Sequence, residues 1–317
     1  MSKYKVPTIE ELIDAGVHFG HQVRRWHPKM EPYIYMVNKN VHIIDLEQTE
    51  NMLKKACEYL YETAKNGKVI VFVGTKRQSK EIIEAEAKRC GAMYVNQRWI
   101  GGTMTNFKTI KNNLDKLLDY IKGKEEGKFD KYTKKERLLI DREIEKMMLV
   151  YGGIINLKGT PGALFIIDPK REKTAVREAK AVGIKTVALV DTNTDPSDVD
   201  FPIPANDDAI KSVALLVRTI SQAVEEGYKE FDKTGKEKSA EAAPSNTTEG
   251  MEAEAKPINI TVDESHIQKL EKEIEKTVEE EKEKIVEKSV DKEETPVKLD
   301  EKDKEAKKRG RPKKDTK

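Results

Sequence analysis

Short runs of apolar, often β-branched residues alternate with helical patterns along most of the first 231 residues of the chain. The runs are KVIVFVG (residues 68–74), AMYV (92–95), ALFIID (163–168), KTVALVD (185–191) and a shorter FPIP (201–204). Strands that alternate with helices are typical of βαβ units, whose strands lie parallel in one sheet and whose helices cover both faces. The alternation therefore predicts an α/β fold, with a Rossmann- or flavodoxin-like parallel sheet flanked by helices.

The segment before the first of these runs has a different pattern. YIYMVNKNVHIID (residues 33–45) predicts a β-hairpin that turns at residues 38–40. Helical spacing and helix-start signals predict the elements around it and the end of the domain. They are a short helix with a capping box at Thr8 and Glu11, a turn over residues 15–22, and helices over residues 45–64 and 207–226.

Residues 106–150 interrupt the alternation, because they contain two helical patterns and no strand pattern. Apolar residues recur at helical spacing at Phe107, Ile110, Leu114, Leu117 and Ile121, and again at Ile140, Ile144, Met147 and Tyr151. A charged loop (residues 123–132) separates the two patterns, and Thr133 with Glu136 has the spacing of a capping box. One apolar seam on each helix predicts an antiparallel coiled-coil hairpin that projects from the sheet domain.

The last 86 residues, 232–317, differ sharply in composition from the rest. They contain no Phe, Trp or Tyr and carry 21 basic and 24 acidic residues, whereas the first 231 residues carry 38 basic and 33 acidic ones. So little apolar surface cannot offset the entropy of ordering, so we expect a disordered charged tail. Its end, KKRGRPKK, resembles an AT-hook core, with a nonspecific basic tip as the simpler interpretation.

These patterns predict three parts: an α/β globular domain formed by residues 1–105 and 151–231, a hairpin arm of residues 106–150, and the tail of residues 232–317. The sequence shows neither a signal peptide nor an apolar run long enough to span a membrane, which predicts a cytoplasmic protein without a membrane partner. Cys57 and Cys90 stand alone in helical patterns and are predicted to be buried thiols.

An enzymatic interpretation depends on acidic residues near the expected carboxyl ends of the strands. Residues 190–209 supply six aspartates, of which Asp191 and Asp208 could combine with His18 and His21 in a metal site. This arrangement would suit a metal-dependent hydrolase or phosphotransferase. The simpler interpretation is that the aspartates form turns and that Asp207 or Asp208 caps the last helix. The loop after the first strand, GTKRQ, has no phosphate-cradling glycine motif, and no GxSxG motif occurs.

A nucleic-acid partner is favoured by basic residues interleaved with tryptophan. Arginine pairs with phosphate and stacks on bases, and indole offers a flat ring for stacking. Gly101 and Gly102 would also let backbone amides approach a phosphate. The residues predicted to contact nucleic acid are Arg24, Arg25, Trp26 and Lys29 in one cluster, Arg98, Trp99, Lys108 and Lys111 in a second, and Lys76 with Arg77 after the first strand.

Six sequence blocks, in one order, resemble a known family. They are GVHFGHQ with WHPKM (residues 16–30), VHIIDL (41–46), FVGTKRQ (72–78), NQRWIGGTMTN (96–106), TPGALFIID (160–168) and VDTNTDPSDVDFPIPANDDA (190–209). The family is the bacterial form of the second protein of the small ribosomal subunit, and the resemblance covers residues 9–226.

The resemblance implies a fold, partners and a role. It implies a doubly wound domain with a coiled-coil arm that binds ribosomal RNA where the head and body of the small subunit meet, in the cytoplasm. It also implies contacts with neighbouring small-subunit proteins, including help in docking the first one, and no catalysis. The basic residues named above become expected RNA contacts. Some members are associated with zinc, so a zinc ion at the predicted metal site is the one cofactor left open.

Overall fold

The structure is a computed structural model that describes residues 4–241, with side chains up to residue 233. Five parallel strands form its main sheet: β4 (Ile70–Val73), β5 (Met93–Val95), β6 (Ala163–Ile167), β7 (Lys185–Val190) and β8 (Phe201–Pro204). Their order is β5-β4-β6-β7-β8, which is the flavodoxin-like order with the reversal of strand order between β4 and β6. The predicted α/β fold and all five predicted strands are confirmed.

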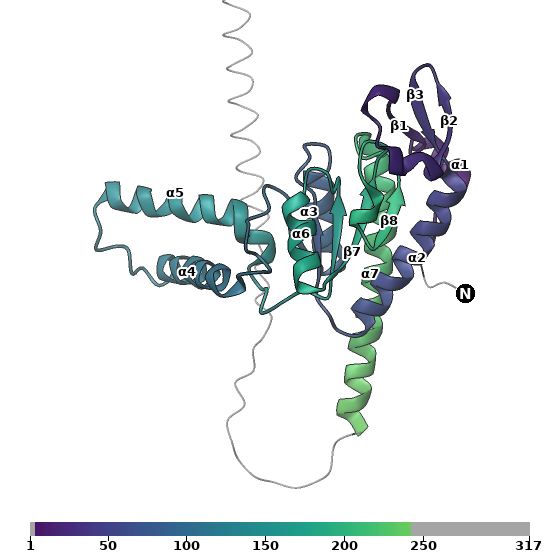
Figure 1. Cartoon of the computed structure of the whole chain (residues 1–317). Coiled ribbons are helices and arrows are strands. Elements are labelled where there is room, and N and C mark those ends of the chain that lie inside the picture. The colour runs from purple at the N-terminus through teal and green to yellow at the C-terminus, as the bar shows by residue number, and fades with distance from the viewer. Residues whose placement is uncertain (1–3, 242–317) are drawn as a thin grey trace, which may run out of the picture. The chain divides into compact units, whose positions relative to one another are not determined.

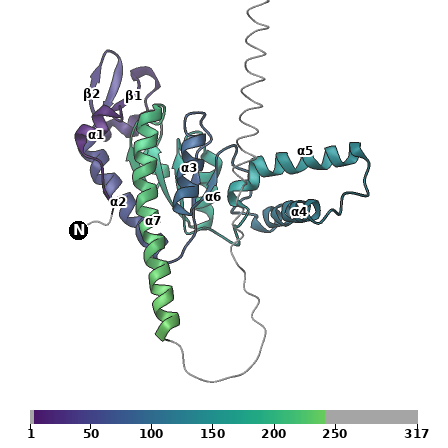
Figure 2. The same ribbon diagram turned by 180° about the vertical axis from the view of Figure 1, so that it is seen from behind.

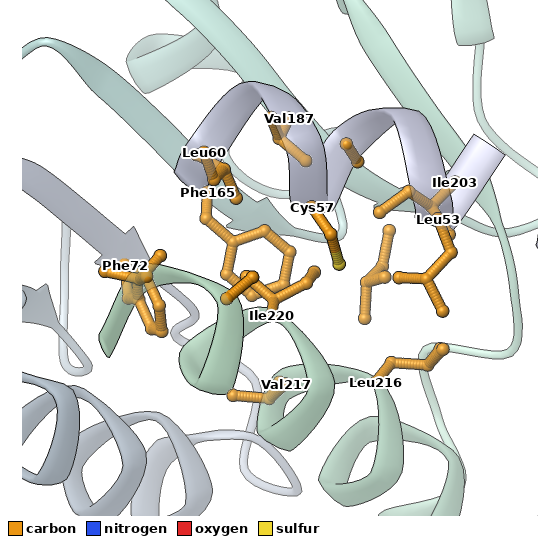
Figure 3. Packing of buried hydrophobic residues seen from close by; sticks show 14 of the residues in the cluster. Leu53, Cys57, Leu60, Phe72, Phe165, Val187, Ile203, Leu216, Val217 and Ile220 are labelled. Atoms are coloured by element: carbon orange, nitrogen blue, oxygen red, sulfur yellow. The ribbon is translucent and has the colours of Figure 1, made fainter. Parts of the chain in front are cut away.

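Side chains of successive strand residues point to opposite faces of the sheet, and both faces are apolar. Ile70, Phe72 and Phe165 belong to one buried cluster, whereas Val71 and Leu164 belong to the other. Three helices, α2 (Leu46–Lys65), α3 (Lys80–Cys90) and α7 (Ile210–Glu241), contribute to the first cluster, and α6 (Lys173–Val182) to the second. Figure 3 shows α2 and α7 side chains packed around Phe165.

The two cysteines are buried, as predicted, and both belong to the first cluster. Both thiols are free and buried, and burial raises the pKa of Cys57 to about 12 and that of Cys90 to about 11. Both therefore remain protonated and pack as small apolar side chains.

A second, three-stranded antiparallel sheet is built by residues before α2. Its strands are β1 (Phe19–Gln22), β2 (Ile34–Asn38) and β3 (Val41–Ile44), in the order β1-β3-β2. The predicted hairpin is confirmed: Lys39 and Asn40 have φ angles of 47° and 63°, as a type I′ turn requires. β1 corrects the expectation of a simple turn over residues 15–22. Figures 1 and 2 show this sheet at the end of the domain where α7 begins.

The helix-start signals at Thr8 and Thr133 are also confirmed. Thr8 and Glu11 form a complete capping box for α1 (Ile9–Asp14), and Thr133 and Glu136 do the same for α5 (Lys134–Tyr151). The sequence rule works here because the bonds that define the motif join residues only three apart.

The two helical patterns of residues 106–150 form α4 (Phe107–Glu125) and α5, which extend away from the sheet in Figure 1. Ion pairs of 2.7 Å join Lys116 to Glu143 and Lys124 to Asp141 across the two helices. The base of α4 is anchored, because Ile110 and Leu114 are buried in the second cluster. The helices are as predicted, and their packing as a coiled coil remains a prediction.

The loop between β5 and α4 is held by a carboxylate from α6. Glu178 is 7% exposed, and its two oxygens accept hydrogen bonds from the amides of Gly102, Met104 and Thr105 at 2.7 to 3.4 Å. The indole N–H of Trp99 donates to the same group at 3.4 Å. The amides near Gly101 and Gly102, which the sequence suggested for a phosphate, thus bind an anion supplied by the protein itself.

The last helix differs from its prediction at both ends. Asn206, rather than Asp207 or Asp208, supplies the side-chain oxygen that accepts the first amides, those of Asp208 and Ala209. The helix continues past residue 226 to Glu241, ten residues into the predicted tail. Gly227 does not end it but allows a close crossing with α2, because a Cβ there would lie 2.6 Å from the carbonyl oxygen of Tyr61.

The remainder of the predicted disordered tail, with its AT-hook-like end, lies outside the described residues. Within residues 4–241, none of the helices combines the length and apolarity needed to cross a membrane.

We expect Glu178→Ala to lower the free energy of unfolding by roughly 3–5 kcal/mol, because one buried amide, two partly buried amides and an indole N–H lose their acceptor together. Urea unfolding followed by circular dichroism measures the change. Glu81→Ala, which removes an exposed carboxylate from α3, is the control and should change stability by less than about 0.5 kcal/mol. A loss below about 1 kcal/mol in the Glu178 variant would contradict the assigned role.

Candidate nucleic-acid interface

The segment with most of the predicted contacts is fixed against the carboxyl end of β7. The amide of His21 donates to Thr192 Oγ1 at 2.8 Å, and the amide of His27 donates to the Thr192 carbonyl at 2.7 Å. Gly20 is required at this approach, since a Cβ there would lie 2.6 Å from Thr192 Cγ2. The block GVHFGHQ therefore attaches the basic residues that follow it to the parallel sheet.

Those basic residues lie in two short 3-10 helices, η1 (Val23–Arg25) and η2 (Pro28–Tyr33). Arg24 and Arg25 are exposed, and Arg24 donates only to the side chain of Gln22, at 3.1 Å. Trp26 is half-buried beside His42, with 5.2 Å between ring centroids. The structure thus brings the first predicted cluster together on one short segment.

Within the described part of the chain, Lys29 is the one member of this cluster with an acidic partner. Its ammonium group lies 2.6 Å from Asp195 and 2.7 Å from the hydroxyl of Ser197. Partial burial opposes ionisation of Asp195, but the bonds from Lys29 and Ser197 outweigh it and lower the pKa of Asp195 to about 2. Asp195 also accepts the amide of Ser197 at the start of η4 (Pro196–Asp198), as its predicted turn role requires.

The second predicted cluster is divided by the fold. Arg98, Lys108 and Lys111 are exposed around the start of α4, and none forms an ion pair with another described residue. Arg77, at the turn after β4, is also exposed and forms no ion pair with another described residue. Trp99 is a correction: it is 6% exposed, packed in the second apolar cluster and bonded to Glu178, so its ring is not available to a base.

Lys76 is the second correction to the predicted RNA contacts. Its side chain is 13% exposed, and its ammonium group lies 2.7 Å from Asp208, 2.8 Å from Asp207 and 3.3 Å from Asp168. Burial alone would lower the pKa of Lys76, but the three carboxylates outweigh it and raise that pKa. The charge of Lys76 is therefore used inside the protein.

The same group of side chains fills the place where flavodoxin-like sheets bind ligands, between the carboxyl ends of β4 and β6. Besides Lys76, Thr75 donates to Glu172 at 2.5 Å, and Arg171 donates to Thr75 at 2.8 Å. Burial raises the pKa of Glu172. The side chains at this position bind one another. They therefore occupy the crevice in which this fold usually binds a ligand.

Three of the four predicted metal ligands meet beside this group. His21 Nδ1 lies 3.0 Å from Asp191, and His21 Nε2 lies 3.5 Å from Asp208. The three donor atoms fall within 4.8 Å of one another. His18 is not part of this set; its ring lies against Phe19, and its Nδ1 is buried without a hydrogen-bond partner.

The donor set fits a zinc ion in chemistry, since imidazole and carboxylates are zinc ligands. The neighbouring Asp207 has one buried oxygen, Oδ2, without a hydrogen-bond partner. Lys76, however, already provides a positive charge to two of these aspartates. His21 also has an amide partner, Asn193, at 2.9 Å. Zinc at this position remains a prediction.

Lys170 and Lys173 were missed by sequence reasoning. They line one cavity together with Arg25 and Trp26, although they are about 145 residues away in the chain. The sequence signal that could have indicated them is DPKREK (residues 168–173), a basic loop directly after a strand end. Only the parallel order of β6 and β7 places this loop beside the basic segment after β1.

We expect the stability of the protein to fall as pH rises from about 6 to 8. The hydrogen bond to Asp191 raises the pKa of His21, so the stability from its charged form is complete below about 6.5 and is lost as pH rises through the raised value. Burial, with Asp191 and Asp168, raises the pKa of Asp207 to about 7, which acts in the same direction. Melting temperatures at pH 6, 7 and 8 measure the effect.

Asp207→Asn removes one of the two titrating groups and should flatten this dependence, whereas Asp14→Asn, at an exposed position, should leave it unchanged. A wild-type melting temperature that is constant or rises over this range would contradict the prediction.

Comparison with known proteins agrees with the sequence resemblance. The family described as ribosomal protein S2 matches residues 12–227. A small ribosomal subunit protein uS2 from Dictyoglomus turgidum is 49% identical over 219 residues, which are 69% of this chain and 89% of that protein. Proteins with the same name from Picosynechococcus and Geotalea uraniireducens are 48% and 46% identical over 222 and 220 residues, or 70% and 69% of this chain and 87% and 86% of theirs. The chain therefore belongs to the ribosomal protein S2 family.

Proposed function

We propose that this protein is a structural component of the small ribosomal subunit that binds ribosomal RNA. Its family consists of ribosomal proteins, so the chain is a structural protein and not an enzyme, and the metal-dependent hydrolase or phosphotransferase interpretation is set aside. The proposal includes a location on cytoplasmic ribosomes.

One observation supports RNA binding most directly. Five exposed cations, Arg25, Arg77, Arg98, Lys108 and Lys111, have no acidic partner among the described residues. Lys76 and Lys29, by contrast, are paired with aspartates. Cations that a protein leaves unpaired on its surface are suited to bind a phosphate backbone.

The arm supports a contact with a neighbouring molecule. Leu138, Leu139 and Leu149 on α5 are each at least 50% exposed, which is unusual for a helix that faces only water. We propose that α4 and α5 form a coiled-coil arm and that this surface contacts neighbouring small-subunit proteins. On the basis of the family resemblance, we also propose that the protein lies at the junction of head and body. We propose further that it helps to dock the first small-subunit protein.

We expect the full chain to sediment with small subunits from cell extract and to bind small-subunit ribosomal RNA. Arg98→Ala and Lys108→Ala should each weaken binding and reduce the slope of log affinity against log salt by roughly 0.7–0.9, because each neutralised phosphate releases counterions. Lys55→Ala with Lys211→Ala removes two exposed charges elsewhere and should leave the slope unchanged. Absence of the wild-type protein from the subunit fraction would refute the function.

Neighbouring residues Lys76 and Arg77 should behave differently. Lys76→Met leaves three aspartates without their cation and should cost about 3–5 kcal/mol of stability, measured by urea unfolding. Arg77→Ala should leave stability within about 0.5 kcal/mol and weaken RNA binding instead. If Lys76→Met were as stable as the wild type, its assignment to the interior would be wrong.

A further inference from the structure

A cavity of about 250 Å³ lies between three segments that are distant in the sequence. One segment carries Arg25 and Trp26, the second is the loop between β6 and α6 with Lys170 and the first residue of α6, Lys173, and the third is residues 193–198 after β7. The side chains that fill the crevice at β4 and β6 do not line this cavity, and Asn193, the amide partner of His21, is shared with the His21 cluster. Its lining combines the aromatic ring of Trp26 with three basic side chains, two aspartates and the polar side chains of Asn193 and Thr194.

The charge around this cavity is positive and largely unneutralised. Arg25, Lys170 and Lys173 are exposed, and none is ion-paired with another described residue; Lys170 donates only to the Asn193 carbonyl, at 3.0 Å. The acidic groups that line the cavity are Asp195 and Asp198. Asp195 is held by Lys29 at 2.6 Å, so three cations face one uncompensated carboxylate, which favours an anionic ligand.

The aromatic ring in the lining, that of Trp26, packs against the ring of His42. The His42 ring is itself buried and has no hydrogen-bond partner at either nitrogen. Burial lowers the pKa of His42, so it packs as a neutral ring. A fixed indole beside three cations is the combination that binds a nucleotide, with the base against the ring and the phosphate against the cations.

We propose that this cavity receives one unpaired nucleotide of an RNA strand, with its base against Trp26 and its phosphate against Arg25, Lys170 and Lys173. The inference rests on the proposed RNA-binding function and adds to it a specific site, including two lysines outside the predicted set. A base inside a duplex is paired and stacked and cannot enter, so the cavity selects a looped-out or single-stranded nucleotide.

The test uses the full chain bound to small-subunit ribosomal RNA, with 2′-hydroxyl acylation to report unpaired nucleotides. Wild-type protein should protect a nucleotide that becomes reactive with Trp26→Ala and with Lys170→Ala plus Lys173→Ala. Trp26→Phe, which keeps an aromatic ring, should restore the protection, and Lys55→Ala with Lys211→Ala should leave it intact. Trp26→Ala should also weaken RNA affinity by roughly 5- to 100-fold, the range for loss of one stacked base.

The outcomes separate this site from the function on which it rests. If the variants protect the same nucleotides as the wild type while binding persists, the site is wrong and RNA binding stands; if the wild type neither binds nor sediments with subunits, the function itself fails. Should Trp26→Ala fold poorly by circular dichroism, the exposed lysine pair decides the question. Adenosine monophosphate is tested separately: Trp26-dependent binding of it, without any Trp26-dependent RNA protection, would reassign the cavity to free nucleotides.

Discussion

Lys76 lies where the loops after β4, β6 and β8 meet, and its ammonium group is within 3.3 Å of carboxylates from both of the other two loops. Without that cation, Asp168, Asp207 and Asp208 would repel one another in a largely buried position, at a cost of several kcal/mol. Once the three loops are joined, His21 adds β1 to the same edge through Asp191 and Asp208. Together with the hydrogen bonds to Thr192, this cluster therefore joins the small antiparallel sheet and the basic segment after β1 to the carboxyl edge of the parallel sheet.

Glu178 plays a corresponding role, but here a buried anion satisfies N–H donors, whereas at Lys76 a largely buried cation neutralises carboxylates. A loop of backbone amides from residues 102–105 would bind an external anion in many proteins, yet here it is satisfied by a carboxylate from α6. That bond fixes the start of α4, where Lys108 and Lys111 are exposed. In both places, charged groups that could bind a ligand are instead paired with groups of the protein itself. These internal contacts also fix the segments that carry exposed cations.

The parts of the fold that could be predicted from the sequence depend on short-range physics. The five strands follow from β-branched runs, and the capping boxes at Thr8 and Thr133 follow from bonds between residues three apart. β1 escaped prediction because FGHQ has no alternating pattern and is a strand only by pairing with β3. The continuation of α7 past Gly227 depends on its crossing with α2, which no local pattern contains.

Prediction of the site had the same limit. Residue types identified the basic clusters, but exposure depends on partners that are distant in the sequence, such as Asp207 for Lys76 at a separation of 131 residues and Glu178 for Trp99 at a separation of 79. Conversely, Lys170 and Lys173 line the cavity beside Trp26 only because β6 and β7 are neighbours. A count of basic residues therefore does not identify an RNA surface in this fold, because the tertiary structure has already neutralised some of the cations with carboxylates distant in the sequence.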